Sequence, residues 1–375
     1  MISDNNIRVE RIDDETRFQA LRDDWNTLAT QASRDSVFLR HEWFDAAWEW
    51  CRADSAMEIL CVWRGVELVG ICPFVSRRKR RRGLTIKVIE FLGVPDNQLC
   101  DVLAASSDIG QVIEAAIAYV RDDCDMLVLE SIPAESPTCQ ILDSYLTRHD
   151  VCGIQMPKQA NPCINLTSGW KNFYASRSRR LKKANNWVAN RLERAGKKIT
   201  LKWFRAGHFP RAEIDQALEE AIRLSACSWK RDTGFTLDRA GPHAFFRRLA
   251  HHSLNQGWLS LWMLSLDDKP VAAELQMIYE GNVHALRSDF DCAYNDLSVG
   301  SYLNWKQLEQ LFDSHLNRYW MGPGDNPYKN HWAEDAVELH SYAFYGSSWR
   351  SRWLILCDLW LRPVVLKFAG KLLRK

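Results

Sequence analysis

The sequence predicts an α/β (α+β) protein made of two mixed-sheet units in tandem. The same order of helices and strands occurs twice, about two hundred residues apart, and 375 residues exceed the usual size of one hydrophobic core. Hydrophobic residues make up 46% and charged residues 26%, which is typical of a globular chain. Two compact units are therefore expected.

The first unit opens with two amphipathic helices. Apolar side chains such as Phe18, Leu21 and Trp25 recur at helical spacing, and the pattern then changes to that of strands. The expected elements are, in order, helices over 16–32 and 41–51, strands over 58–63, 66–75 and 85–92, a helix over 109–121 and a buried strand over 126–130.

The second unit repeats this order. Its expected elements are helices over 213–227 and 243–255, strands over 258–266, 271–279 and 282–290, a helix over 300–315 and a strand over 318–321. An internal duplication accounts for both units. Chance recurrence of the order in an α+β chain is the alternative.

These patterns predict four segments. Residues 1–160 form the amino-terminal unit, and residues 211–346 form the carboxyl-terminal unit. Between them, residues 161–210 hold a strand and a long basic connecting helix over 169–196. Residues 347–375 form a basic amphipathic helix.

The charge is balanced overall and strongly basic in two places. The formal net charge is +2, yet Arg77–Arg82 is a run of six basic residues and Ser176–Lys183 adds five more. Local imbalance says more about partners than the total charge does. Both segments are therefore candidates for contact with an anion.

Cysteine spacing and the amino-terminal pattern exclude several classes of protein. The eleven cysteines form no CxxC pair and no Cys/His metal spacing, and their number is odd, so neither a disulfide framework nor a zinc site is expected. The first residues show no leader pattern, and no run of roughly 18 apolar residues occurs. A cytoplasmic protein without a transmembrane helix is expected.

Three stretches carry a resemblance to a known superfamily: Gly65–Gly93, Lys269–Leu311 and Arg318–Lys329. Over most of its length the chain resembles the GNAT acyltransferases, in particular the CelD-like enzymes of the cell envelope and exopolysaccharides. It also resembles the Fem-type peptidyltransferases, which carry two such units. The resemblance implies the acyl-CoA N-acyltransferase fold, acyl-CoA or acetyl-CoA as co-substrate, an amine-bearing acceptor and no metal.

The stretch LSVGSYLNW, residues 297–305, is the candidate donor site. A helix start offers unpaired N–H groups and the positive end of the helix dipole, which favour a diphosphate. The residues concerned are Ser298, Val299, Gly300 and Ser301. Gly300 stands alone where the superfamily's loop has further small residues. The alternative is an ordinary helix start capped by Ser298 or Ser301.

A glycine- and proline-rich stretch, GPGDNPYKNHW, covers residues 322–332. Its composition predicts a shaped loop, and such loops carry function more often than stability. The order G-x-G-D-x-x-Y-K matches the pattern that the resemblance implies. The sequence departs from that pattern at Trp320, where the family commonly has an aspartate.

Acyl transfer to an amine requires a neutral amine, a polarised thioester carbonyl and a proton for the departing thiolate. Tyr328 is the candidate donor of that proton, and Lys329 is the candidate for stabilising the oxyanion. Asp325 would orient Lys329 or accept the proton of the amine. The alternative is a surface ion pair between Asp325 and Lys329 beside a tight turn.

Isolated polar residues in two apolar strands are further candidates. Glu274 and Asp289 would lie either in a cleft or on a solvated face. Arg287 lies two residues from Asp289 and so on the same face, which makes a structural ion pair the alternative. His284 has the pKa range of a general base, although a strand histidine is more often packed.

The end of the chain is a candidate membrane contact. Trp349–Lys375 interleaves seven basic residues and one acid with large apolar side chains, which is typical of an interfacial helix. Arg77–Arg82 would add attraction to anionic lipid. Peripheral binding to the inner membrane is therefore expected. The alternative is a helix docked on the protein's own core, with Arg77–Arg82 as a solvated hairpin tip.

Nucleic acid is the competing anionic partner. The basic segments lack any accompanying RNA-binding signature, so nucleic acid is not expected as a partner.

These features predict an enzyme, an acyltransferase that moves groups other than aminoacyl groups from acyl-CoA to an amine. The expected acceptor is an envelope lipid, a sphingoid-type base or a polysaccharide precursor. The first unit would form one wall of the acceptor cleft, because it has no GDxxYK match. Two alternatives stay open: a non-catalytic scaffold of an exopolysaccharide or cellulose synthesis complex, and an aminoacyl-tRNA-dependent Fem-type peptidyltransferase.

Overall fold

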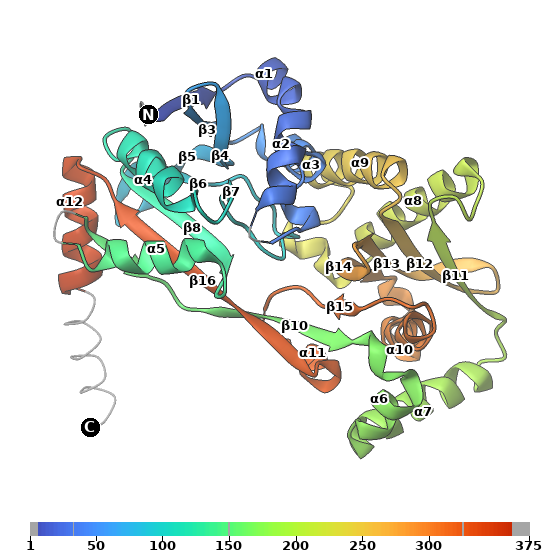
Figure 1. Cartoon of the computed structure of the whole chain (residues 1–375). Coiled ribbons are helices and arrows are strands. Elements are labelled where there is room, and N and C mark those ends of the chain that lie inside the picture. Colours follow the sequence, from blue (N-terminus) through green and yellow to red (C-terminus); the bar gives the residue numbers. More distant parts are fainter. Residues whose placement is uncertain (1–6, 33, 149–150, 325, 362–375) are drawn as a thin grey trace, which may run out of the picture.

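The computed structural model describes residues 7–32, 34–148, 151–324 and 326–361. Figure 1 shows two lobes of strands and helices that are joined by long crossing strands. Asp325 and the last part of the predicted amphipathic helix, residues 362–375, lie outside the described residues.

The first unit contains two groups of strands with helices packed on them. Its elements are β1 (Ile7–Ile12), α1 (Glu15–Ala20), α2 (Arg22–Gln31), α3 (His41–Cys51), β2 (Ala56–Met57), β3 (Ile59–Arg64), β4 (Glu67–Cys72), β5 (Phe74–Arg81), β6 (Leu84–Phe91), β7 (Leu103–Ala104), α4 (Ile109–Val120), β8 (Met126–Pro133), α5 (Pro137–Leu146) and β9 (Gly153–Gln155). Strands β1, β3, β4 and β7 form a four-stranded antiparallel sheet.

The second unit has one mixed sheet flanked by helices. Its elements are β10 (Gln159–Asn165), α6 (Trp170–Ser176), α7 (Arg179–Arg194), β11 (Ile199–Arg205), α8 (Arg211–Ala226), α9 (Ala240–Asn255), β12 (Leu259–Leu266), β13 (Lys269–Tyr279), β14 (Asn282–Phe290), α10 (Val299–Phe312), β15 (Arg318–Trp320), α11 (Pro327–Trp332), β16 (Asp335–Tyr345) and α12 (Trp349–Ile355).

The predicted order of elements is confirmed in both units, with local corrections. The helix expected over 16–32 is two helices, α1 and α2, with Leu21 between them. The strand expected over 66–75 is two strands. Pro73 separates β4 from β5 because proline has no N–H for a ladder, and the chain changes sheet at this point. The long connecting helix is likewise two helices, α6 and α7, and Ser178 caps the second. The loop expected over 322–332 ends in the short helix α11.

One 12-stranded sheet runs through both units. The first half of β16 pairs with β10, and its second half pairs with β8 of the first unit. In turn, β10 pairs with β15 of the second unit. Figure 1 shows β10 and β16 crossing between the lobes. The two units therefore share strands, and the segment boundary proposed at residue 160 falls inside β10.

Strands β14 and β15 diverge in the second unit. They pair in parallel only from Asn282 to His284 of β14. Just beyond, β14 carries a bulge at Leu286, where its pairing with β13 passes from Ala285 to Arg287. A bulge bends its strand and re-aims side chains. The remainder of β14 therefore leaves β15, which positions the cavity described below.

The described part of the final segment packs on the first unit. Leu354 of α12 is fully buried, and Asp358 lies 2.7 Å from both Arg81 and Arg82. For α12 the docked alternative is therefore correct. The basic run Arg77–Arg82 does lie at the end of a hairpin: Arg77–Arg81 belong to β5, which pairs with β6 across a turn at Arg82 and Gly83, and Arg78–Arg80 are exposed.

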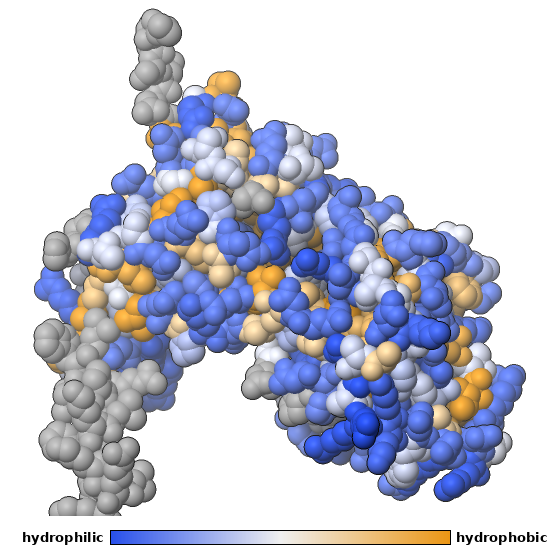
Figure 2. All heavy atoms as spheres, turned by 60° about the horizontal axis from the view of Figure 1, so that its bottom comes forward, coloured by the Kyte–Doolittle hydropathy of each residue, from blue (hydrophilic) through white to orange (hydrophobic). Residues whose placement is uncertain are grey.

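The surface on the face shown in Figure 2 is mostly hydrophilic, and its apolar patches are small and separate. In the part of the chain that the structure describes, no helix is both long and apolar enough to cross a membrane. The same residues hold no group of three metal-ligating side chains.

Candidate active site

A cavity of about 760 Å³ lies where β14 leaves β15. Its walls come from β14, from helices α7, α10 and α11, and from residues 95–97 of the first unit. Six of the nine predicted site residues line it: Glu274, Ser298, Gly300, Ser301, Tyr328 and Lys329. The predicted donor segment and the predicted catalytic loop thus meet in one cavity.

Helix α10 begins without a side-chain cap. Ser298 has a φ of +52°, and its hydroxyl makes no hydrogen bond to the first-turn amides. Elsewhere, Ser136 and Ser178 do cap α5 and α7. Gly300 lies against the ring of Phe290, where an added Cβ would come within 3.0 Å of a ring carbon. The first-turn amides of α10 are therefore available to a ligand, as a diphosphate would require.

Two further residues of α10 differ in where their side chains lie. The side chain of Val299 is fully buried in the core and does not line the cavity. Asn304 does line it, and its buried Oδ1 has no hydrogen-bond partner among the described residues. A buried polar atom without a partner calls for a ligand or water.

Glu274 is held by a buried polar network. The Tyr319 hydroxyl donates to Oε1 at 2.6 Å, and Gln276 Nε2 donates to the same oxygen at 2.8 Å. Ser260 and Trp262 each donate to the carbonyl oxygen of the Gln276 side chain at 3.0 Å. Burial and the Glu274 carboxylate raise the pKa of Tyr319 well above its usual range, which keeps the hydroxyl a donor.

Helix α11 carries Tyr328 and Lys329 to the cavity. Lys329 Nζ donates to the carbonyls of Gly322 at 2.8 Å and Pro323 at 2.9 Å. No acid pairs with it within the described ranges, and burial lowers its pKa to about 8. Tyr328 stays 40% exposed, yet desolvation by its surroundings, followed by the Glu274 carboxylate, raises the pKa of its phenol.

The charged residues of β14 pair with other elements. Arg287 Nε donates to Asp96 of the first unit at 2.8 Å, and Nη2 donates to the Phe235 carbonyl at 2.7 Å. Asp289 lies 2.9 Å from Lys230 Nζ. The suggested Arg287–Asp289 pair is therefore wrong, because each residue has a partner on another element. Asp289 does not line the cavity, whereas Asp96, Lys230 and Arg287 do.

His284 is packed. Burial lowers its pKa to about 3, with a smaller contribution from the Arg34 charge. Its ring meets Phe38 edge-on and stacks on Trp320. The packed alternative is therefore correct for this residue. The predicted Asp325–Lys329 pair stays a prediction, because Asp325 lies outside the described residues.

Sequence reasoning missed the residues that reach the cavity from elsewhere. Asp96 comes from the first unit, and Lys230 comes from a short turn after α8. Neither stands in a motif. The docking of the first unit brings Asp96 to β14, and packing within the second unit brings Lys230 there. Trp187 and Trp229, which also line the cavity, are more than half exposed. Exposed aromatic residues of this size are the signal that could have pointed to this surface.

Residues 186–330 match the family model for the acetyltransferase (GNAT) domain. This range contains the uncapped helix start, the bulged strand and the two predicted residues of α11, Tyr328 and Lys329. The chain carries a GNAT acyltransferase domain. The resemblance to the GNAT acyltransferases is thereby confirmed, as is the prediction of an acyltransferase enzyme.

Solved structures resemble the GNAT domain together with the rest of the chain. FemX is 10% identical with a TM-score of 0.53, over 88% of this chain and 96% of that chain. The C-terminal DUF2156 domain of an Agrobacterium fabrum protein named as a lysylphosphatidylglycerol synthetase is 11% identical with a TM-score of 0.53, over 90% and 97%. A Bacteroides thetaiotaomicron protein of unknown function is 12% identical with a TM-score of 0.51, over 91% and 100%.

These likenesses extend beyond the GNAT domain to nearly the whole chain, and they show the fold alone. The mixed α/β fold of the acyl-CoA N-acyltransferases, predicted from the sequence, is confirmed. No curated protein sequence matches the chain.

Proposed function

We propose that this chain transfers an acyl group from acyl-CoA or acetyl-CoA to the amine of an envelope lipid, a sphingoid-type base or a polysaccharide precursor. One observation carries the proposal. The uncapped start of α10 meets Glu274, Tyr328 and Lys329 in a single cavity. The match to the GNAT domain supports acyl transfer in general. The identities of the donor and of the acceptor are what we propose here.

The donor would enter between α7 and α10. Its diphosphate would lie on the amides that open α10, next to Gly300. Asn304 Oδ1, which has no partner among the described residues, would accept from an amide N–H of the pantetheine arm. Trp187 and Trp229 would cover the adenine or an apolar acyl chain, because both are broad exposed faces on the cavity wall.

The transfer would run through a tetrahedral intermediate. Glu274 Oε2, the oxygen not engaged by the network, would take the proton of the attacking amine as the C–N bond forms. The Lys329 ammonium would stabilise the oxyanion. Tyr328, kept neutral by its raised pKa, would protonate the thiolate as the C–S bond breaks. Exchange with water then restores both side chains.

Two predicted residues would act indirectly. Asp289 holds Lys230 in the cavity wall through a 2.9 Å ion pair, so we assign it a positioning role. For Asp325 we keep the proposed role of orienting Lys329 or accepting the proton of the amine.

Donor binding is tested by calorimetric titration of acetyl-CoA and a long-chain acyl-CoA into the wild type and Gly300→Asp. An acidic residue in the first turn favours the helix but repels a diphosphate, so the dissociation constant is expected to rise about tenfold or more. Gly110→Asp is the matched control, because Gly110 is also the second residue of a helix, α4. Equal binding by both variants contradicts the proposed donor site, and no binding by the wild type favours the scaffold alternative.

We also propose peripheral contact with an anionic surface of the inner membrane through α12. Trp349, Trp353 and Leu356 are 62%, 42% and 43% exposed, and their spacing puts them on one face of the helix. Arg78 and Arg80 are the two residues of the Arg77–Arg82 run that have no acidic partner in the described part of the chain. The apolar side chains would enter the lipid headgroup region, and the unpaired arginines would be attracted to anionic lipid headgroups.

Sedimentation with vesicles containing phosphatidylglycerol tests this contact. The double variant Trp349→Ser with Trp353→Ser is expected to pellet several-fold less than the wild type, because the apolar stripe is lost. Tyr119→Ser, which removes an exposed aromatic ring on α4, is the control. Undiminished pelleting of the double variant argues against the membrane contact.

A further inference from the structure

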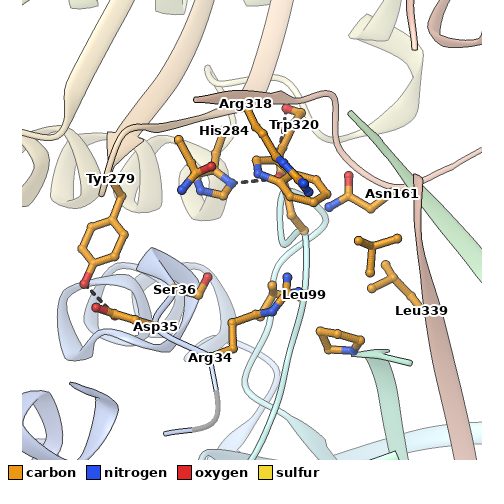
Figure 3. A pocket seen from close by; sticks show the side chains of 14 residues that line it. Arg34, Asp35, Ser36, Leu99, Asn161, Tyr279, His284, Arg318, Trp320 and Leu339 are labelled. Carbon is orange, nitrogen blue, oxygen red and sulfur yellow. Dashed lines mark hydrogen bonds between the residues drawn. The ribbon is translucent and has the colours of Figure 1, made fainter. Parts of the chain in front are cut away.

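A second cavity, of about 250 Å³, lies between the two units (Figure 3). From the first unit it is lined by Arg34–Ser36 and by Gln98 and Leu99. From the second unit it is lined by the starts of β14 and β15. The crossing strands add Asn161 from β10 and Leu339 from β16. It therefore adjoins the same strand pair as the active-site cavity, but at the paired end of β14 and β15.

Gln98 links this inter-unit pocket to the reacting groups. Its Nε2 donates to the carbonyls of Ala285 at 2.8 Å and Trp320 at 3.3 Å, which is the point where β14 and β15 separate. A Cβ placed on Gly322 would lie 3.8 Å from both Gln98 Nε2 and Lys329 Nζ. The pocket thus lies beside the end of the active-site cavity that holds Lys329.

Gln98 also fixes the polarity of the pocket wall. Because its Nε2 donates to two carbonyls, its Oε1 accepts, and His284 Nδ1 at 3.0 Å carries the proton of that bond. The buried imidazole is neutral and so offers Nε2 as an acceptor. The pocket wall therefore presents His284 Nε2, a hydrogen-bond acceptor, together with the cationic side chains of Arg34 and Arg318.

Among the described residues that line this pocket, Asn161 has a buried polar atom that the fold leaves without a partner. It is 4% exposed, and its Oδ1 has no hydrogen-bond partner among the described residues. Figure 3 shows its amide projecting into the pocket toward Trp320 and Arg318. A buried amide oxygen without a partner destabilises the folded protein, so the position calls for a ligand with a hydrogen-bond donor.

Two arginines enter the pocket from opposite walls (Figure 3). Arg34 comes from the first unit and forms an ion pair with Glu135. Arg318 comes from β15, with its guanidinium 5.8 Å from the Trp320 ring centre, and it has no acidic partner in the described ranges. Guanidinium groups bind oxyanions through charge-assisted hydrogen bonds. Arg318 brings an uncompensated charge to the pocket, and Arg34 brings a second guanidinium whose charge Glu135 shares.

We propose that the inter-unit pocket binds a phosphate group carried by the amine acceptor. Arg34 and Arg318 hold the phosphate oxygens, and Asn161 bonds to a polar group beside it. The Trp320 ring and Leu339 cover the carbon body. The inference rests on the proposed function, and it narrows the acceptor to phosphorylated amines small enough for the pocket, from a lipid headgroup or a free sugar.

Calorimetric titration of the full chain tests this site with phosphoethanolamine as the headgroup source and glucosamine 6-phosphate as the sugar source. Ethanolamine and glucosamine are the matched probes without phosphate. The phosphorylated probe of one source is expected to bind at least about tenfold more tightly than its unphosphorylated partner, because charge-assisted hydrogen bonds to the arginines are strong. The source that binds more tightly identifies the acceptor.

Three variants assign the binding to this pocket. Arg318→Gln is expected to weaken binding of the phosphorylated probe about tenfold. Arg8→Gln is the control, because Arg8 also lies over a tryptophan, 5.5 Å from the ring centre of Trp63. Asn161→Leu should weaken binding without lowering the melting temperature, since its Oδ1 makes no hydrogen bond that folding would lose.

Three results would overturn the proposal: phosphate does not improve binding, Arg318→Gln and Asn161→Leu bind the phosphorylated probe as the wild type does, or Asn161→Leu lowers the melting temperature.

The donor site and the phosphate site can be told apart. Gly300→Asp should leave binding of the phosphorylated probe unchanged, and weaker binding by this variant would place the phosphate at the donor site. Binding of acyl-CoA and binding of the phosphorylated amine are measured separately, so either result can be negative without the other. A protein that binds acyl-CoA but no phosphorylated amine refutes only this inference. The reverse result refutes the proposed function, and with it the role of the ligand as acceptor, but leaves the phosphate site itself in place.

Discussion

Replacing Lys329 with alanine is expected to lower kcat for acyl transfer by about 10²- to 10³-fold, with little change in the KM for the donor, because the lost charge acts on the oxyanion of the transition state. Its Nζ is fixed by two carbonyls and lies in the cavity wall. Thiol release from acyl-CoA in the presence of an amine gives the rate. Lys202→Ala, at an exposed lysine of β11, is the control.

The pH dependence of the rate sharpens this test. Burial lowers the pKa of Lys329 to about 8, so the ammonium is lost as pH rises through that value. The wild-type rate should therefore fall above about pH 8. Lys329→Arg keeps its charge and should not show that fall in whatever activity it retains. The same falling limb in both proteins would mean that another group titrates.

The same shift makes a prediction for stability. Between pH 8 and the ordinary lysine pKa of 10.5, the unfolded chain binds more protons at Lys329 than the folded protein does. Stability due to this group therefore rises with pH across that window. The free energy of unfolding of Lys329→Met, minus that of the wild type, should fall between pH 8 and 10.5 in urea titrations. A constant difference would show that the lysine is not desolvated.

Replacing Glu274 with glutamine is expected to reduce kcat by about 10²- to 10⁴-fold, because an amide cannot take the proton of the amine. The fold should persist. Both hydrogen bonds of the network end on one carboxylate oxygen, and the carbonyl oxygen of a glutamine can accept both.

Two measurements separate this chemical role from a structural one. The melting temperature of Glu274→Gln should stay near that of the wild type, and its affinity for acyl-CoA should be unchanged. Glu213→Gln, at an exposed acid in the first turn of α8, is the control. A rate within about threefold of the wild type would exclude Glu274 as the base, and a marked loss of melting temperature would indicate a structural role instead.

Much of the fold could be predicted from local pattern. Alternating and helical spacing of apolar residues sufficed for the repeated elements, because each element buries its own face. Strands β10 and β16 were not predicted, because neither pairs with a neighbour in a local hairpin. The two halves of β16 pair with strands of different units. The shared sheet joins segments that are far apart in the sequence, so no local pattern of residues predicts it.

The candidate site divides in the same way. Gly300, Tyr328 and Lys329 could be predicted because a helix start and a shaped loop have local signatures. Asp96 and Gln98 could not, because they reach β14 only when the first unit docks on the second.

The docking of α12 on the first unit could not be predicted for a related reason. Periodicity alone does not distinguish lipid from the protein's own core as the cover of an apolar face, and Asp358 pairs there with Arg81 and Arg82.

The central claim is that one cavity of this chain binds acyl-CoA and passes its acyl group to an amine. The most direct measurement is thiol release by the purified wild type, with a panel of acyl-CoA donors and with amine acceptors that include phosphorylated ones. The account predicts saturable thiol release that requires an amine and is lost in Glu274→Gln. Thiol release from no donor by the folded wild type, or equal release by wild type and Glu274→Gln, would contradict it.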